Sequence, residues 1–435
     1  MEARKGPIER VLGLFSDVRP GEGGAVLLLA LNAFNMMALY YILKPIREAL
    51  ILSEAGAEVK SYASAAQAIL FIFVVPLYGA FASRVNRVWL LSGMTLFFIG
   101  NLVLFILAGH AGLHIGVPYY IWLGIFNFMI VSQFWAFAND LYSEEAGKRL
   151  FPIIGIGVSF GALVGAKATS VFIERLGPWE LMSVAAGMLG LFILLIIVTN
   201  RMVSGASTAV AETARERLSP EGGFKLVFQN RYLRLIAFLV LLLNMVNTVG
   251  EFILGKLVET TAIAQIGAGA AFEAQRGAFI GAFYGDFFFW VNLAGFLVQT
   301  FLVSRFFKYI GVRGSLFVLP VISATTYAVT AAMPILRVIR VTKIFENSTD
   351  YSLNNTVRQA LFLPTSREAK YKAKAAIDTF FGRTGDALQA AVVYIGTQLA
   401  FGIRAFALVN LVLVAVWLLI CRGIAREHRR VAKTA

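Results

Sequence analysis

Residues 179–199 read WELMSVAAGMLGLFILLIIVT, and this stretch decides what kind of fold the chain can adopt. After Glu180 it contains no charged side chain, and it is about as long as the ~20 residues that a helix needs to cross a bilayer. Its apolar residues do not alternate with polar ones, which indicates a helix and not a strand. We therefore expect a membrane-spanning helix here.

The rest of the chain has the same character. Hydrophobic residues make up 58% of its 435 residues, charged residues only 15%, and the mean hydropathy is +0.74. One globular core cannot bury so much apolar surface, so the bilayer is the expected solvent. Only helices and closed barrels satisfy every backbone group inside a bilayer. Because the apolar runs lack alternation, we expect an all-α integral membrane protein.

Twelve such segments are expected, six in each half. They cover residues 24–44, 62–82, 88–108, 117–139, 150–173, 179–199, 232–256, 277–303, 312–332, 335–361, 375–400 and 403–424. The tenth is interrupted by charges, so hydropathy alone would miss it. The chain would then divide into an N-terminal segment 1–23, a six-helix bundle 24–199, a linker 200–223, a second bundle 224–424 and a basic tail 425–435.

The distribution of charge predicts the orientation. The net charge of +14 comes largely from Lys and Arg in alternate loops, in the linker and in the tail, as the positive-inside rule requires of cytoplasmic segments. In a soluble protein clustered cations would suggest nucleic acid, but here no nucleic-acid partner is expected. We expect both termini in the cytoplasm, no cleaved signal, and a short amphipathic helix near residues 11–15.

Short motifs recur between the halves. Residues 83–87, SRVNR, follow the second expected helix and match 304–308, SRFFK, a shift of 221 residues. Residues 143–146, SEEA, match 366–369, SREA, a shift of 223 residues. Nearly equal shifts in equivalent loops indicate a duplicated six-helix unit, as in the two pseudo-symmetric halves of major facilitator proteins.

The first expected helix ends in YYILKPIRE, residues 40–48. Lys44, Arg47 and Glu48 would share one face if the helix continues past Pro45. We favour a clamp for phosphate or carboxylate groups, since Arg offers a planar fork and Lys a point charge. The alternative is a group of snorkelling side chains at a helix end, although the outer leaflet is a poor place for two cations.

Polar side chains follow the tenth segment at intervals of three or four residues: Arg337, Arg340, Lys343, Asn347, Asp350, Asn354 and Arg358. This spacing places them in one stripe along a helix. We expect the stripe to line a water-filled cavity. The alternative is an amphipathic helix on the cytoplasmic surface, which would leave eleven spans and move the tail to the other side.

A charge in the middle of a membrane costs roughly 2.5 kcal/mol or more, so it normally lies on a solute pathway or beside a partner. The remaining candidates are Lys167 in the fifth helix, Asn244, Asn247 and Glu251 in the seventh, Asp286 in the eighth, and Asp378, Arg383 and Asp386 in the eleventh. Cations slightly dominate, which suits an anionic solute. Each could equally be a structural ion pair between helices, and we expect this first of Asp378 with Arg383.

Other kinds of chemistry find little support. Residues 155–161, GIGVSFG, lie inside an apolar helix and predict close helix packing, not a dinucleotide site. The aromatic run 287–290, FFFW, is expected to face lipid or the membrane interface. The single cysteine, Cys421, and three histidines argue against disulfides and a metal site. Without a nucleophile–base set or a Walker-type loop, we expect neither an enzyme nor a cofactor.

Longer motifs resemble a known family. Residues 132–140, SQFWAFAND, then 145–152, EAGKRLFP, and later 368–378, EAKYKAKAAID, are similar to motifs of the ATP/ADP translocase (nucleotide transporter) family of plastids and intracellular bacteria. The resemblance extends from Tyr41 to about Ala391. It implies a major-facilitator-like fold that exchanges nucleotides or related organophosphates.

The resemblance also implies roles for single residues. Lys44, Arg47 and Glu48 stand where the family has basic and acidic residues ending its first helix. Glu251 and Lys256 resemble its acidic-then-basic seventh helix, with a longer spacing.

Two further positions stay open as alternatives under this resemblance. Asp140, which follows Asn139, or Glu145 corresponds to the acid after the fourth helix, and Lys372 or Lys374 to the functional lysine near the eleventh. Gly147 and residues 356–359, TVRQ, depart from the family's pattern.

The working hypothesis is exchange of a nucleotide or organophosphate by alternating access, with Lys44, Arg47, Arg337, Arg340 and Arg358 holding the anion. A second is a proton-coupled exporter or a lipid or organic-anion carrier, with Glu48, Glu251, Asp286 and Asp378 as proton sites. A third is a non-transporting sensor or scaffold. We expect a monomer in a bacterial plasma (inner) membrane, with lipid and a small anionic solute as partners.

Overall fold

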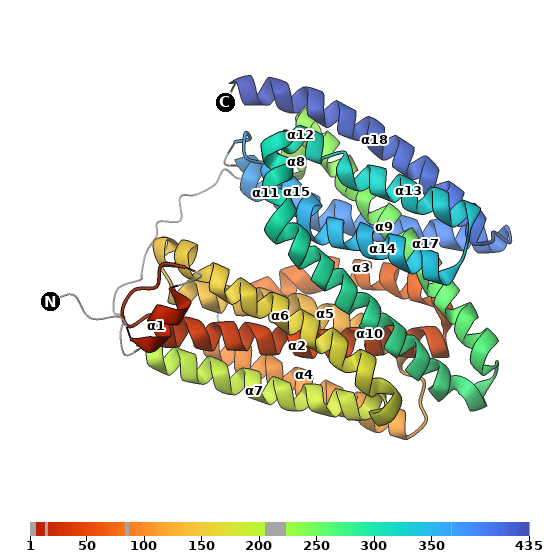
Figure 1. Cartoon of the computed structure of the whole chain (residues 1–435), viewed down its shortest axis with the longest axis horizontal. Helices are drawn as coiled ribbons and strands as arrows, with labels where there is room; N and C mark the ends of the chain where they lie inside the picture. Colours follow the sequence, from red (N-terminus) through yellow and green to blue (C-terminus); the bar gives the residue numbers. More distant parts are fainter. Residues whose placement is uncertain (1–5, 14–15, 83–86, 205–222, 367, 435) are drawn as a thin grey trace. The chain divides into compact units, whose positions relative to one another are not determined.

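The structure is a computed structural model of the chain, and it describes residues 6–13, 16–82, 87–204, 223–366 and 368–434. Every regular element within these ranges is helical, and twelve long helical segments correspond to the twelve expected spans (Figure 1). Within these ranges, the prediction of an all-α fold with apolar helices of membrane-spanning length is confirmed.

The elements follow one another along the chain in this order. Those up to residue 204 are α1 (Pro7–Leu12), α2 (Gly23–Glu54), α3 (Gly56–Ala82), α4 (Arg87–His110), α5 (Gly116–Leu141), α6 (Glu144–Leu176) and α7 (Pro178–Ser204). From residue 223 they are α8 (Gly223–Gln229), α9 (Arg231–Ile266), η1 (Ala270–Phe272), α10 (Glu273–Leu297), η2 (Val298–Leu302), α11 (Val303–Tyr309), α12 (Gly311–Ser315), α13 (Val318–Ala332), α14 (Leu336–Thr349), η3 (Asp350–Asn354), α15 (Asn355–Leu361), η4 (Ala369–Ala373), α16 (Lys374–Ala376), η5 (Ile377–Phe381), α17 (Gly382–Gln398) and α18 (Ile403–Thr434).

Ten helices of the described chain are long and apolar enough to cross a membrane. The tenth expected span, α14 to α15, is not among them, as the sequence predicted. The eleventh, η4 to α17, is also missed by hydropathy, which we did not expect. Both spans are rich in charge and contain π-helical turns, a feature that is frequent at functional sites.

Some expectations differ from the structure or lie outside it. The short N-terminal helix, α1, begins at Pro7 and covers only residues 11 and 12 of the expected stretch 11–15, of which 14 and 15 are not described. Arg84 and Arg367 of the repeated motifs, and residues 205–222 of the linker, are likewise outside the described ranges.

The described residues group into two compact units. Unit 1 comprises Met1–Glu54, Val74–Arg215 and Ala270–Phe289, and unit 2 comprises Ala55–Phe73, Glu216–Gly269 and Trp290–Ala435. α3 and α10 each contribute to both units. The division of the sequence into bundles 24–199 and 224–424 stays a prediction.

Unit 1 is built on α2, which packs against α5, α6 and α7, while α4 packs against α5 and α7 (Figure 1). Three glycines of α6 make the closest of these contacts. A Cβ on Gly157, Gly161 or Gly165 would lie only 2.2, 2.2 or 2.1 Å from a backbone carbonyl oxygen of α2. Small residues allow such close approach between membrane helices. Close packing by the Gly-rich stretch is thus confirmed for Gly157 and Gly161.

Unit 2 is built on α9, which packs against α14, α17 and α18; α13 packs against α14 and α18 (Figure 1). Large apolar side chains on α18 point away from these contacts, for example Val412 and Leu419, which are 65% and 64% exposed. In a soluble protein a row of such residues would be unusual, but a lipid-facing helix requires it.

Replacing Gly161 by alanine should destabilise unit 1 by about 1–3 kcal/mol, because the new Cβ would push against the Phe34 carbonyl of α2. The measurement is the fraction of monodisperse protein that remains after heating in detergent. Gly155→Ala is the matched control on the same helix, since nothing lies within 4 Å of its Cβ position. Equal heat resistance of the two variants would contradict the close α2–α6 contact.

Candidate functional site

Helix α2 continues through Pro45 to Glu54, as the clamp hypothesis required. Pro45 donates no hydrogen bond to the preceding turn, and neighbouring helices supply donors there. The Thr169 hydroxyl of α6 donates to the Ile42 carbonyl at 3.2 Å, and the Tyr119 hydroxyl of α5 donates to the Leu43 carbonyl at 3.4 Å. The helix is therefore supported at the proline, and Lys44, Arg47 and Glu48 stand on one continuous helical face.

The Arg47 guanidinium is held by Glu48. Its Nε lies 3.0 Å from Glu48 Oε1, and a second guanidinium nitrogen bonds the same oxygen. The guanidinium also stacks on Tyr120, at 4.5 Å from the ring centre. Because Arg47 is 15% and Glu48 1% exposed, this carboxylate and this ring compensate a largely buried charge. A ligand phosphate at Arg47 would have to compete with Glu48.

The Lys44 amine lies among aromatic rings, 3.9 Å from the centre of Phe288 and 5.3 Å from that of Tyr41. Phe287 and Phe288 are 0% and 3% exposed. The expectation that the run 287–290 faces lipid is therefore wrong for these two residues, and only Trp290 is substantially exposed. Phe288 instead packs against the Lys44 amine.

A third cation of unit 1, Lys167 on α6, faces Asp286 on α10. Their charged atoms are 3.5 Å apart, and the side chains are 49% and 26% exposed. The Lys167 amine also lies 5.4 Å from the centre of Phe289. This pair is more open than Arg47 with Glu48, so its Coulomb energy is weakened by solvent.

The segment before α2 is tied to the start of α6. Arg149 donates to both carboxylate oxygens of Glu22, at 2.8 and 3.1 Å, and Arg19 lies 2.6 Å from Glu145. Burial alone would raise the pKa of Glu22, but hydrogen bonds from Arg149 and from the Arg19 backbone hold it below its usual range. Asn139 and Asp140, by contrast, are exposed at the end of α5.

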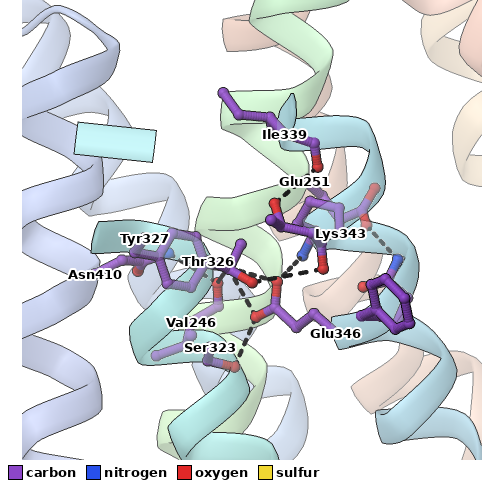
Figure 2. A network of polar contacts seen from close by, with 12 residues as sticks. Val246, Glu251, Ser323, Thr326, Tyr327, Ile339, Lys343, Glu346 and Asn410 are labelled. Carbon is purple, nitrogen blue, oxygen red and sulfur yellow. Dashed lines mark hydrogen bonds and ion pairs between the residues drawn. The ribbon is translucent and has the colours of Figure 1, made fainter. Parts of the chain in front are cut away.

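In unit 2, Lys343 of the polar stripe and the neighbouring Glu346 of α14 point toward polar side chains of α13 (Figure 2). Lys343 and Glu346 are only 1% and 3% exposed, and their charged atoms are 2.9 Å apart. Glu346 also accepts hydrogen bonds from Ser323 at 2.8 Å and from Tyr327 at 3.0 Å. A helix on the membrane surface would expose its polar face, so that alternative is wrong for α14.

The other residues of this stripe lie in different surroundings. Asn347 is buried and donates to Glu251 of α9 at 3.0 Å, and Asn354 donates to Asp350 at 2.8 Å. Arg337 is exposed, whereas Arg340 is partly buried. Asn247, one turn before Glu251 on α9, is also partly buried.

The remaining predicted residues lie in separate ion pairs of unit 2. The Lys256 amine lies 2.9 Å from Glu58 and 3.5 Å from Glu259. Asp378 contacts Arg358 at 3.1 Å and Lys374 at 3.0 Å. Arg383 pairs with Asp386 at 3.4 Å, so the expected pair of Asp378 with Arg383 is replaced by these two arrangements.

Sequence reasoning missed several partners of these groups. Glu346 stands three residues after Lys343, a helical spacing that could have identified the pair. Tyr120, Phe288 and Tyr327 gave no such signal, because an aromatic residue in an apolar run looks the same whether it faces lipid or a buried cation. In the described ranges, no three His, Cys, Asp or Glu side chains gather as they would around a metal ion.

Comparison with known proteins identifies the family. The sequence profile of the TLC ATP/ADP transporter family matches residues 118–428. The chain belongs to this family. The resemblance expected from the motifs is thus confirmed.

Individual relatives are distant. ADP,ATP carrier protein 1 of Chlamydia pneumoniae is 23% identical over 334 residues, which cover 67% of this chain and 62% of that protein. The chloroplastic ADP,ATP carrier protein 1 of Arabidopsis thaliana is 24% identical over 336 residues, 69% of this chain and 52% of that protein. The matched region thus spans less than two thirds of each of these relatives.

Solved structures share the fold. The nucleoside transporter NupG superposes with a TM-score of 0.64 at 13% identity over 92% of this chain and 98% of that one. A bacterial homologue of the iron transporter ferroportin, in an inward-facing state, gives 0.65 at 10% identity over 92% and 98%. Identities this low establish a common transporter fold and no more.

Removing the carboxylate beside Arg47 should be far more harmful than removing the one beside Lys167. Glu48→Gln leaves a largely buried guanidinium without its counter-charge, a loss of about 3–5 kcal/mol. Asp286→Asn should cost about 1 kcal/mol or less, because the amine of Lys167 is half exposed. Thermal unfolding of both purified variants, read by intrinsic fluorescence, measures the difference. A Glu48→Gln protein as heat-stable as Asp286→Asn would show that Glu48 does not compensate Arg47.

Proposed function

We propose that this family member exchanges nucleotides, or related organophosphate anions, across the plasma membrane of a bacterium. The observation that carries the proposal is the family match over residues 118–428, together with relatives that are named ADP,ATP carriers. The basic loops and the tail support an orientation with both termini in the cytoplasm.

Unit 1 offers the chemistry that such a ligand needs. Lys44 and Arg47 are cations on one face of α2, and Tyr41 and Phe288 lie beside the Lys44 amine. Arg binds phosphate through its planar fork, Lys binds it as a point charge, and aromatic faces stack on nucleobases. Glu48 would act as an internal counter-ion, which a phosphate group replaces at Arg47 when it binds.

Unit 2 offers further cations for the same class of ligand. Arg337 and Arg340 begin the polar stripe of α14, and the exposed Arg337 is open to solvent. Lys343 lies one turn further, but its ion pair with Glu346 makes it less suited to contact a ligand. We assign ligand binding in unit 2 to the two arginines, with the roles of Arg358 and Lys374 tied to Asp378.

The proposal is tested with purified protein in liposomes preloaded with ATP, ADP or inorganic phosphate, by measuring uptake of labelled ATP. Exchange should require an internal phosphate compound, and an Arg47→Gln/Glu48→Gln variant should lose at least about tenfold in rate, equivalent to ~1.4 kcal/mol. The double substitution removes both charges, so it tests ligand binding without leaving Glu48 buried and alone.

Arg404→Gln serves as the control, since this exposed arginine begins α18 and belongs to none of the clusters described above. It should exchange at the rate of the unaltered protein. Uptake of a neutral or cationic solute in place of every phosphate compound would contradict the proposal, and undiminished exchange in the double variant would remove Arg47 from the binding site.

A further inference from the structure

Two carboxylates of unit 2 lie in the same polar network but are held in different ways (Figure 2). Glu346 has three polar partners, the Ser323 hydroxyl, the Tyr327 hydroxyl and the Lys343 amine. Such a set of donors stabilises the ionised carboxylate. The Lys343 charge is thereby matched inside its own helix, and the Glu346 carboxylate has donors on every side that these contacts describe.

Glu251 has a neutral partner instead. Its Oε1 accepts a hydrogen bond from the Asn347 amide nitrogen at 3.0 Å. Asn347 is only 2% exposed, and its amide oxygen Oδ1 is buried without a hydrogen-bond donor. A buried acceptor left without a donor costs about 1–3 kcal/mol. With Glu251 ionised, the pair therefore lacks one hydrogen-bond donor.

A proton on Glu251 supplies that hydrogen. The carboxylic O–H can donate to Asn347 Oδ1 while the amide N–H continues to donate to the other carboxyl oxygen, which closes a ring of two hydrogen bonds. If the amide is turned over, its oxygen faces Oε1, and a proton is again needed between the two oxygens. In either orientation of the amide, a proton on Glu251 supplies a donor that the amide oxygen otherwise lacks.

We propose that Glu251 and Asn347 form a proton-binding site, in which Glu251 takes up the proton and Asn347 holds it. The step adds H⁺ to a carboxylate and breaks no covalent bond. Protonation also removes a negative charge from a partly buried position, which lowers its desolvation cost. This inference is independent of which solute the protein carries.

The neighbouring core fixes the geometry of this site. A Cβ on Gly250 would lie 2.1 Å from the Tyr327 hydroxyl and 2.8 Å from the Lys343 amine. The network around Glu346 therefore packs directly against the turn of α9 that carries Glu251. The Tyr327 hydroxyl also lies 3.1 Å from the Val246 carbonyl, to which the Asn410 amide of α18 donates at 3.1 Å. Lys343, Glu346 and Tyr327 are thus positioning residues for Glu251.

The other charged groups around α9 have partners of their own. From α14 and η3 these are Lys343 with Glu346, and Asp350 with Asn354. From η5 and α17 they are Asp378 with Arg358 and Lys374, and Arg383 with Asp386. α13 contributes the Tyr327 hydroxyl and α18 the neutral Asn410. Across these described contacts, the Glu251–Asn347 pair is the one in which a carboxyl meets a buried amide with an open acceptor.

Infrared difference spectroscopy tests the proposal on the full chain in lipid nanodiscs, without any solute. The carbonyl stretch of a protonated carboxyl should appear in the spectrum as the pH is lowered. The band should lose intensity in Glu251→Gln, in which the new amide mimics the protonated acid. In Asn347→Leu the band should change frequency and appear only at lower pH, because the acceptor of the proton is lost.

Glu259→Gln is the matched control, since this carboxyl of the same helix is paired with Lys256 and should leave the band unchanged. Folding of each variant is checked with a thiol-reactive dye on Cys421, the single and fully buried cysteine. If Glu251→Gln did not fold, the shift in Asn347→Leu would still decide. An unchanged band in Glu251→Gln or Asn347→Leu, or a band that responds to Na⁺ at constant pH, would overturn the proposal.

Discussion

Compensation of charge inside a protein that lies in lipid is the constraint on which the rest of this structure depends. A buried cation in a medium of low dielectric is costly unless a carboxylate or an aromatic face lies beside it. Arg47 has Glu48 and Tyr120, and Lys343 has Glu346. Several of the cations that made the sequence look like an anion carrier, namely Arg47, Lys343 and Arg358, are therefore already partnered. A solute anion that binds Arg47 would therefore have to displace the Glu48 carboxylate. Binding of the anion is in this way linked to release of Glu48.

Close approach of helices allows these partners to meet. Glycines of α6 bring its backbone against α2, and Gly250 of α9 leaves room for the Tyr327 hydroxyl and the Lys343 amine. Lipid offers little hydrophobic drive for helices to associate, so shape and hydrogen bonds must hold the helices together. The glycines therefore matter to the polar clusters as well as to the packing, because a methyl group at Gly250 would displace the network that supports Glu251.

Much of the fold follows from the length and apolar character of the segments, and this part could be predicted because a bilayer imposes one length on every helix. The tenth span was recognised by the three- and four-residue spacing of its charges, and the structure confirms a continuous helical segment there. The lipid-facing expectation failed for Phe287 and Phe288, because hydropathy does not distinguish a ring beside lipid from a ring beside Lys44. Partners on other helices, such as Tyr327 for Glu346, could not be predicted without knowing which helices are neighbours. The ligand roles of the predicted site residues rest on charge and family, and they remain proposals.

In the proposed function, Lys44, Arg47, Arg337 and Arg340 recognise the phosphate groups of the solute. Calorimetric titration of the purified protein with ATP, adenosine and inorganic phosphate, at low and at high salt, tests it most directly. The account predicts that ATP binds more tightly than phosphate, that adenosine binds much more weakly than ATP, and that salt weakens ATP binding, since salt screens exposed charges. Adenosine binding as tightly as ATP, with no effect of salt, would contradict the account.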